Sequence, residues 1–427
     1  MDTLSALYQQ FDPLRPLEVE ESDLYVDWQR QCGPEDIKKR LANSIAYTGS
    51  IPVTRLFTGH RGVGKTTELK RVKHELENRT PRRFVSLLQA ADWVDLGDVQ
   101  PPDLVLHIVR QLVTDLKDAG FGLGWTKFIQ FFAEIKDILS TEVELKNLKV
   151  GGPVEFGIAI KDVPGARGKL RKLLEDRLPT IYDLINKEVL RPAREWLTES
   201  GYDDLVVIVD QLDRIPQKVL HTSLTNHENL FLDNAGTLRA LNCHMLFTIP
   251  IELAYSRCRG RLGDVYGSQI LTLPVIPVTD RGRKDFSPGL DAMRKIAGVR
   301  AARAGVTAGF FEDDALLDQF CRLSGGHVRS LFILLRSAIE RSDTLPLTRA
   351  VAERTIRRAA ADLVLPLQKP DWEVLREVHQ TKEKPQDPAR ADIWHGLLRD
   401  LFVFGYEDDA GIWYDWNPLL GAMGDPV

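Results

Sequence analysis

GHRGVGKT, residues 59–66, matches the phosphate-binding pattern GxxxxGK(S/T) in full. Apolar and β-branched residues precede the segment and helix-forming residues follow it, which is the strand–loop–helix context that the pattern requires. Its glycines, Gly59, Gly62 and Gly64, let backbone N–H groups converge on phosphate oxygens without clashes from Cβ atoms. The N-terminus of the following helix adds the positive end of its dipole. We therefore expect a phosphate-binding loop that holds ATP.

Two residues of this loop have chemical roles of their own. The Lys65 ammonium is expected to reach the β- and γ-phosphates, and the Thr66 hydroxyl is expected to be a ligand of Mg²⁺. The remaining positions that we expect around the nucleotide are Gly59, His60, Arg61, Gly62, Val63, Gly64 and Thr67. ATP and Mg²⁺ are the predicted cofactors.

A second acidic motif follows the most hydrophobic run of the chain, Leu205 to Val209, which ends in Asp210. A P-loop needs a carboxylate at the end of another buried strand, so Asp210 is predicted to hold Mg²⁺. Many hydrolytic ATPases place Glu directly after this aspartate, but this chain has Gln211, which cannot accept a proton as a carboxylate does. Asp213 is the nearest alternative base, or else it caps the next segment. Because losing a general base costs about 10²–10⁴ in rate, slow hydrolysis is predicted.

The order of elements predicts an α/β fold. Five short apolar runs alternate with helical segments, at residues 53–58, 84–88, 205–209, 245–249 and 270–273, which indicates a mainly parallel sheet covered on both faces. We predict a P-loop NTPase core at 51–280 with an insertion at 121–200. The insertion is expected to hold a helix (about 127–139), a β-hairpin (143–160) and two further helices (about 167–189 and 192–200), with a break before Pro192. An N-terminal segment and helix (1–50) precede the core. A helical lid (281–365) and a winged-helix-like domain (366–427) follow. The last domain is expected to hold two or three helices and then a hairpin with its turn at Asp408-Asp409-Ala410-Gly411.

The composition describes an ordinary globular protein. Among 427 residues, 43% are hydrophobic and 27% charged, and the formal net charge is −5. That charge gives no global attraction to nucleic acid or anionic lipid. The four cysteines fit no metal-ligand spacing. We find no signal peptide and no apolar run of the roughly 20 residues that span a bilayer. We therefore expect a cytoplasmic protein without membrane contact.

The motifs GHRGVGKTTEL and VIVDQLDR resemble those of the AAA+/STAND group of P-loop ATPases, and bacterial conflict and defence members in particular. The group also includes origin-recognition-like ATPases with a helical lid and a winged helix, and this chain matches that order over nearly its whole length. STAND switches usually carry an effector domain and sensor repeats, which this sequence lacks. The resemblance therefore implies an effector or sensor protein that acts in trans.

The resemblance also suggests roles for further residues. Thr248 lies where the family's sensor on the fourth strand contacts the γ-phosphate, although a buried strand threonine is the alternative. Gly325-Gly326-His327-Val328-Arg329 is similar to the lid motif whose arginine reads the nucleotide, so Arg329 is the candidate, against a surface helix arginine.

Three arginines lie between the fourth and fifth strands: Arg257, Arg259 and Arg261. In oligomeric AAA+ proteins an arginine here reaches a neighbour's site as a finger. Arg261 is the candidate, and an ATP-dependent homo-oligomer would follow. A solvated basic turn is the alternative.

Three functional hypotheses remain. The first is a slowly hydrolysing ATP switch with a partner in trans, in anti-phage defence or signalling. The second is a DNA-associated AAA+ loader or initiator. The third is an inactive scaffold that bound nucleotide stabilises. Residues 371–427 carry five Lys or Arg against twelve Asp or Glu, which disfavours DNA binding there. DNA contact could still come from two basic sets: Lys146, Lys149 and Lys161 in the insertion, and Arg294, Lys295, Arg300 and Arg303 in the helical segment.

Overall fold

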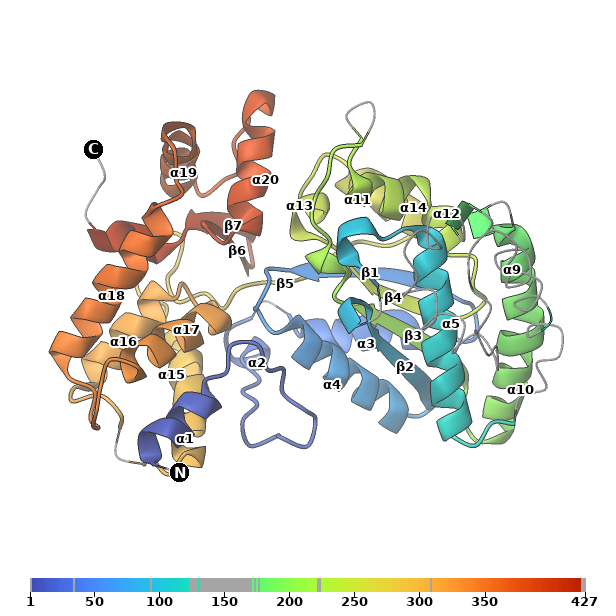
Figure 1. Ribbon diagram of the computed structural model, residues 1–427, viewed down its shortest axis with the longest axis horizontal. Helices are drawn as coiled ribbons and strands as arrows, with labels where there is room; N and C mark the ends of the chain where they lie inside the picture. The colour runs from blue at the N-terminus through green and yellow to red at the C-terminus, as the bar shows by residue number, and fades with distance from the viewer. Residues whose placement is uncertain are drawn as a thin grey trace, which may run out of the picture. The chain divides into compact units, whose positions relative to one another are not determined.

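The computed structural model describes residues 2–33, 35–92, 94–122, 130, 171–172, 174–175, 177–220, 224–307 and 309–423 (Figure 1). The chain forms two compact units. The loop unit comprises Met1–Arg40, Thr58–Glu68 and Thr272–Val427, and the sheet unit comprises Leu41–Phe57 and Leu69–Leu271. The phosphate loop therefore belongs to the same unit as the C-terminal part of the chain. The bounds of the four domains predicted from the sequence stay predictions.

The central sheet confirms the predicted fold class. Its strands are β1 (Thr54–Gly59), β2 (Arg83–Gln89), β3 (Asp204–Asp210), β4 (His244–Thr248) and β5 (Leu271–Leu273). They lie in the order β2-β3-β4-β1-β5, and the pairs β2–β3, β3–β4 and β1–β4 run parallel. Every residue of β3 is buried, as expected for a parallel strand covered on both faces.

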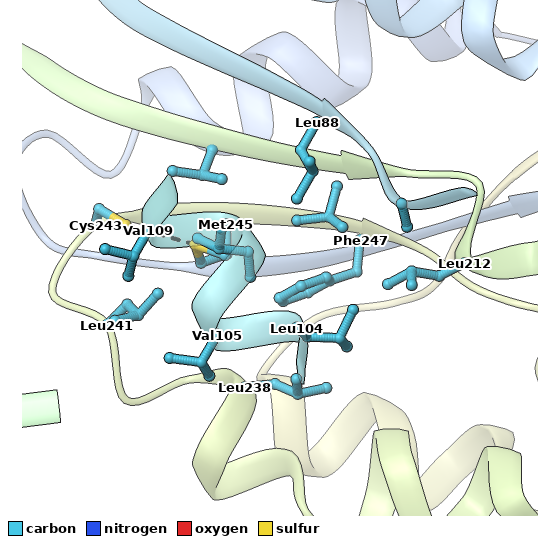
Figure 2. Packing of buried hydrophobic residues seen from close by; sticks show 14 of the residues in the cluster. Leu88, Leu104, Val105, Val109, Leu212, Leu238, Leu241, Cys243, Met245 and Phe247 are labelled. Carbon is cyan, nitrogen blue, oxygen red and sulfur yellow. Dashed lines mark hydrogen bonds between the residues drawn. The ribbon is translucent and has the colours of Figure 1, made fainter. Parts of the chain in front are cut away.

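Helices α4 (Lys65–Asn78) and α5 (Pro101–Asp118) follow β1 and β2, and α5 packs against β2 and β3. Figure 2 shows Leu104, Val105 and Val109 of α5 beside Met245 and Phe247 of β4, within the main apolar cluster of the sheet unit. Fully burying side chains of this size contributes about 1.5–3 kcal/mol each. This core holds the strands whose carboxyl ends carry the acidic motif.

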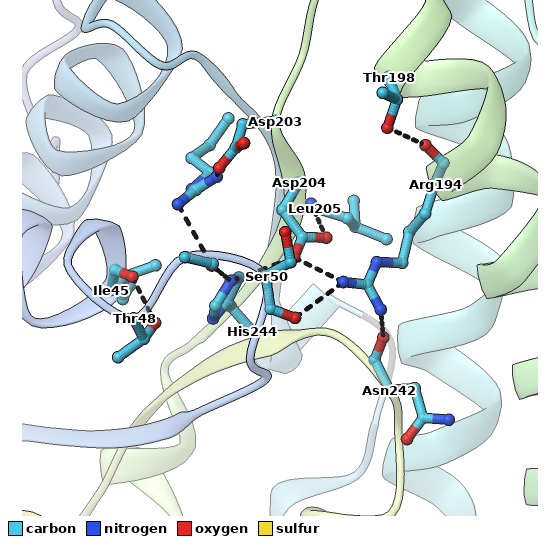
Figure 3. Close-up of polar contacts among 12 residues, drawn as sticks. Ile45, Thr48, Ser50, Arg194, Thr198, Asp203, Asp204, Leu205, Asn242 and His244 are labelled. Carbon is cyan, nitrogen blue, oxygen red and sulfur yellow. Dashed lines mark hydrogen bonds and ion pairs between the residues drawn. The ribbon is translucent and has the colours of Figure 1, made fainter.

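A polar network occupies the amino-terminal ends of the same strands (Figure 3). Arg194 donates to the carboxylate of Asp204 at 2.7 Å and to the carbonyl oxygen of Ser50 at 3.0 Å. His244 Nε2 lies 3.4 Å from the same carboxylate. Burial raises the pKa of Asp204, but the hydrogen bonds from His244 and Leu205 and the charge of Arg194 outweigh it, so the net pKa is lowered. The network therefore fixes the start of β3 with a paired, ionised carboxylate.

The described part of the insertion is helical. Leu178–Leu184 (α9), a π-helical stretch Ile185–Leu190 and Arg191–Glu199 (α10) follow one another directly. The sequence predicts a break before Pro192, and this prediction is wrong. A wider π turn just before the proline accommodates the missing N–H, so the helix continues. The predicted helix at 127–139 and hairpin at 143–160, with Lys146, Lys149 and Lys161, lie outside the described residues.

The rest of the chain is mostly helical. In the loop unit, α1 (Thr3–Gln10) and α2 (Gln29–Cys32) precede α15 (Ser287–Arg303), α16 (Asp314–Leu323), α17 (Val328–Ile339), α18 (Arg349–Val364), α19 (Lys369–Thr381) and α20 (Ala391–Arg399). Helix α3 (Ile37–Ala46) leads into the sheet unit, which also holds α11 (Asn226–Glu228), α12 (Ala235–Leu238), α13 (Ile251–Ala254) and α14 (Arg259–Tyr266). None of the helices in the described ranges has the length and apolar character needed to cross a membrane.

The predicted hairpin lies near the C-terminus, before a short 3-10 helix (Pro418–Met423). β6 (Val403–Asp408) and β7 (Gly411–Trp416) pair in antiparallel fashion, and the Asp408–Gly411 turn joins them. Two helices, α19 and α20, precede the hairpin in the loop unit (Figure 1). The helices and the hairpin that the sequence predicts are therefore present, and their assignment to a lid and a winged helix stays a prediction.

Candidate nucleotide-binding site

The phosphate loop joins the end of β1 to the start of α4. Gly62 and Gly64 have φ angles of +92° and +109°, which side-chain-bearing residues rarely adopt. The backbone N–H of Glu68 donates to the carbonyl of Gly64, so the helical ladder begins at the last glycine of the loop. The first amides of α4 therefore lie at the loop, as an anion-binding helix N-terminus requires.

Lys65 lies within this loop rather than in solvent. Its side chain is buried, and its ammonium donates to the carbonyl oxygens of Gly59 at 2.7 Å and His60 at 2.9 Å. Both acceptors belong to the loop itself. Lys65 therefore lies along the loop that the sequence predicts will bind phosphate.

The helical segment contacts the loop through His327, which caps the N-terminus of α17. Its Nδ1 accepts from the backbone N–H of Ser330, so its Nε2 carries the proton and donates to the carbonyl oxygen of Arg61 at 2.8 Å. The side chain is buried. Burial, together with the positive charges of Arg329 and Lys65, lowers the pKa of His327 to about 3. The imidazole is therefore neutral, with both nitrogens in use.

Arg329, the predicted lid arginine, lies against the same loop. A Cβ atom added to Gly62 would be 2.7 Å from both Cβ and Nε of Arg329, so only glycine fits beneath this side chain. The Arg329 Nε donates to the carbonyl oxygen of Pro13 at 3.0 Å. The guanidinium is thus held beside the phosphate loop by the N-terminal segment.

The C-terminal hairpin also contacts the loop. The backbone N–H of Gly405 in β6 donates to Nε2 of His60 at 2.9 Å. The ring of Phe404 packs edge-on against His60 and stacks on His327, with centroids 5.7 and 5.5 Å apart. Burial, followed by the proximity of His327 and Lys65, lowers the pKa of His60 well below its ordinary value. His60 is therefore a neutral acceptor that joins the loop to the hairpin.

The N-terminal segment completes these contacts. The backbone N–H of Leu17 donates to the hydroxyl of Thr67 at 3.1 Å, and the Tyr25 hydroxyl donates to the carboxylate of Glu68 at 3.1 Å. Three parts of the loop unit thus meet at its phosphate loop: the N-terminal segment, the start of α17 and strand β6.

The acidic motif lies in the sheet unit, at the carboxyl end of β3. Asp210 is buried, and one of its carboxylate oxygens accepts from the backbone N–H of Gln211 at 2.7 Å. Gln211 has a φ angle of +69°, an uncommon value for a residue with a side chain, and its amide donates to Gln89 on β2 at 2.6 Å. The hydroxyl of Thr248 accepts from the backbone N–H of Leu212 at 3.1 Å. Hydrogen bonds to the two neighbouring strands, β2 and β4, therefore stabilise the sharp turn at the end of β3.

The donor atoms suit the predicted cofactors. Glycines at positive φ, a helix N-terminus and a buried lysine fit phosphate, whereas hydroxyl and carboxylate oxygens are the ligands that Mg²⁺ prefers. Thr66 belongs to the loop unit and Asp210 to the sheet unit. Their joint Mg²⁺ site stays a prediction, as does the contact of Thr248 with nucleotide.

The remaining candidates lie in the sheet unit. Asp213 is half-buried in a short helical turn after Gln211, and its role as a base stays a prediction. Arg259 donates to the carbonyl oxygen of Ala254 at 2.9 Å, whereas Arg257 and Arg261 are exposed. An exposed arginine is what a finger requires, and Arg261 remains the candidate.

The strand order and the geometry of the loop decide the fold. It is that of a P-loop ATPase. Sheet, phosphate loop, helical segment and C-terminal hairpin follow one another as the AAA+ resemblance predicts. The narrower assignment to STAND-type defence ATPases stays a prediction.

No protein-family model matches the sequence, and no curated protein is similar to it. Among solved structures, the chain is similar to the ORC2 protein of Aeropyrum pernix in ADPNP–ADP complexes, with 13% identity over 97% of this chain and 94% of that one, at a TM-score of 0.45. It is also similar to a Walker-type ATPase of Pyrococcus abyssi (14% identity, 97% and 99% covered, TM-score 0.47). A third similar structure is that of Cdc6p from Pyrobaculum aerophilum, with 10% identity over 96% of this chain and 94% of that one, at a TM-score of 0.37.

Sequence reasoning missed several contacts of the loop. His327 was part of the lid motif but had no predicted role, and Gly405, Pro13 and Leu17 were not candidates. The last three act through backbone atoms, which leave no signature in side-chain patterns. For His327 a signal existed, because a histidine directly before a helical run is in a position to cap it.

Proposed function

We propose that the chain is an ATP-binding, slowly hydrolysing ATPase that works as a molecular switch. One observation carries the proposal, namely two hydrogen bonds to the phosphate loop. The carbonyl oxygen of Arg61 accepts from His327 of the lid, and Nε2 of His60 accepts from the backbone N–H of Gly405 in the hairpin. A ligand that reshapes the loop must change both contacts, and a ligand shifts a two-state equilibrium only through such differential contacts. Nucleotide state and the position of lid and hairpin are thereby linked.

Each residue of the site has a proposed role. Lys65 and the amides of residues 59–67 hold the phosphates, and Arg329 reads the γ-phosphate from the lid. Thr66 and Asp210 hold Mg²⁺, which when bound neutralises phosphate charge. Asp213 orients the attacking water, because Gln211 bonds Gln89 and has no carboxylate to offer. Hydrolysis is therefore slow, as a timer requires.

The switch acts on a partner effector or sensor protein in trans, in defence or signalling. Arg261 supplies a finger to a neighbouring copy, so assembly depends on ATP. Light scattering with and without ATP tests this step. An Arg261→Ala protein that still assembles with ATP but hydrolyses it at the basal rate supports the finger, and assembly unaffected by ATP argues against it.

The nucleotide site itself is tested by Lys65→Ala. The ammonium makes charge-assisted hydrogen bonds, each contributing about 1.5–3 kcal/mol, so we expect ATP affinity to fall at least about tenfold in isothermal titration calorimetry. Lys295→Ala removes the same charge from an exposed position on α15 and should leave affinity unchanged. Equal affinities of the Lys65→Ala and wild-type proteins would refute the site.

A DNA-associated loader or initiator ATPase is the second candidate. It uses the same nucleotide site, and the observation that favours it is a group of exposed arginines on α18 (described below). Gel shifts with duplex DNA and ATP across a salt series separate the two candidates. Salt-sensitive duplex binding favours the loader, and its absence favours the switch.

A further inference from the structure

A concave site lies on the helical segment of the loop unit, away from the residues of the phosphate loop. Its cavity of about 640 Å³ is lined by Arg341, Arg354, Arg357, Arg358 and Ala361, here called the arginine pocket. Three of the arginines and the alanine are spaced three and four residues apart on α18, so they share one helix face. Arg341 follows the end of α17. Two consecutive helices therefore bring four guanidinium groups to one hollow.

The positive charge of the pocket is only partly balanced. Arg357 pairs with Glu353 at 3.8 Å and Arg358 pairs with Asp362 at 3.0 Å. All four of these side chains are half or more exposed, and such i,i+4 pairs on a helix surface contribute little and exchange readily with other ions. Among the described residues, Arg354 has no ion-pair partner. Four arginines against two carboxylates leave a formal charge of +2.

Arg341 is oriented by the last turn of the preceding helix, α17. Its guanidinium donates to the carbonyl oxygen and the hydroxyl of Ser337, at 2.5 and 2.7 Å. Both acceptors are neutral, so they leave the charge of Arg341 unbalanced. The other arginines lie on α18, so two segments of the chain supply the positive charge that lines the hollow.

We propose that the arginine pocket binds clustered phosphate groups at a site separate from the phosphate loop. A guanidinium presents a planar fork of donors that matches phosphate oxygens two at a time. Only arginines supply charge to the pocket, and its volume lies within the roughly 300–1,000 Å³ of small-ligand sites. A single carboxylate balances one arginine, whereas linked phosphates balance several at once. The two sources of this chemistry are a free polyphosphorylated molecule and the phosphodiester backbone of nucleic acid.

The test compares Arg354→Ala/Arg357→Ala with the wild-type chain. Inorganic tripolyphosphate is titrated by calorimetry into each protein with ADP and Mg²⁺ in excess, so that the phosphate loop is already engaged. Fluorescein-labelled single-stranded and duplex oligonucleotides are titrated by anisotropy across a salt series. Lys369→Ala/Lys384→Ala removes two exposed charges elsewhere in the same unit and is the matched control.

We expect the arginine variant to bind one of these probes at least tenfold more weakly than the wild type, and the lysine control to bind like the wild type. A loss for tripolyphosphate identifies a small polyphosphorylated ligand. A loss confined to oligonucleotides, with a salt slope smaller by about two, identifies a nucleic-acid backbone. The proposal is overturned if neither probe binds the wild type, if both double variants lose affinity equally, or if a polyglutamate peptide binds as tightly as tripolyphosphate.

Discussion

Replacing His327 with Gln should make the free energy of unfolding less dependent on pH in the acid range. In the folded chain His327 donates from Nε2 to Arg61 and accepts at Nδ1 from Ser330, so a second proton would break the helix cap. Lys65 and Arg329, the charged groups nearby, oppose that proton as well. A glutamine amide can still donate to the carbonyl oxygen of Arg61, but it does not titrate.

The magnitude follows from the pKa of about 3 in the folded chain. The unfolded chain, with a histidine pKa of about 6.5, binds the proton first, so stability is full above that pH and falls as the pH decreases. The slope is about 1.4 kcal/mol per pH unit, which makes the loss about 2 kcal/mol between roughly pH 6.5 and pH 5. Carboxylates titrate alike in both proteins, so the difference between the curves isolates His327.

Urea unfolding of the two proteins over this pH range measures the effect. At neutral pH the variant should be less stable by about 1–3 kcal/mol, because it loses the helix cap and the stacking on Phe404. Towards acid pH the wild type should lose its advantage. Parallel curves for the two proteins would show that His327 is not a buried, neutral contact between lid and loop.

Three further outcomes are expected. Gly62→Ala should accelerate hydrogen exchange in α17, because the new Cβ atom meets Arg329; Gly64→Ala, also at positive φ but with no atom within 4 Å of its Cβ position, should not. Thr248→Val should destabilise the chain by about 1–3 kcal/mol in denaturant titration by leaving the N–H of Leu212 unpaired, and Thr248→Ser should restore it. Arg194→Ala should cost about 3 kcal/mol by leaving the buried Asp204 carboxylate short of a cation; a loss below 1 kcal/mol would contradict the network in Figure 3.

The sheet and the loop were predictable because their signals are local. Five apolar runs, a glycine pattern and an aspartate at a strand end are each visible within about ten residues. The turn in the terminal hairpin was equally clear. Arg329 was found only through a family resemblance, and its position on Gly62 depends on the packing of segments far apart in the sequence.

What the sequence could not predict has a common physical origin. The bonds from His327 to Arg61 and from Gly405 to His60 each use a backbone group, and any residue type could supply that group. The helix break expected at Pro192 is absent for a related reason, because a π-helical stretch directly before the proline lets the helix continue. Side-chain patterns report on burial and charge, whereas these features depend on where main-chain groups meet.

The bond between Gly405 and His60 has a practical consequence for dissecting this protein. A fragment cut to the conventional ATPase boundaries, residues 51–280, would keep the sheet but strip its loop of α17 and β6. His60 and the carbonyl oxygen of Arg61 would then meet solvent, where the full chain provides Gly405 and His327 as partners. A minimal fragment suited to nucleotide studies must therefore retain residues through the second hairpin strand, even though these lie more than three hundred positions away in the sequence.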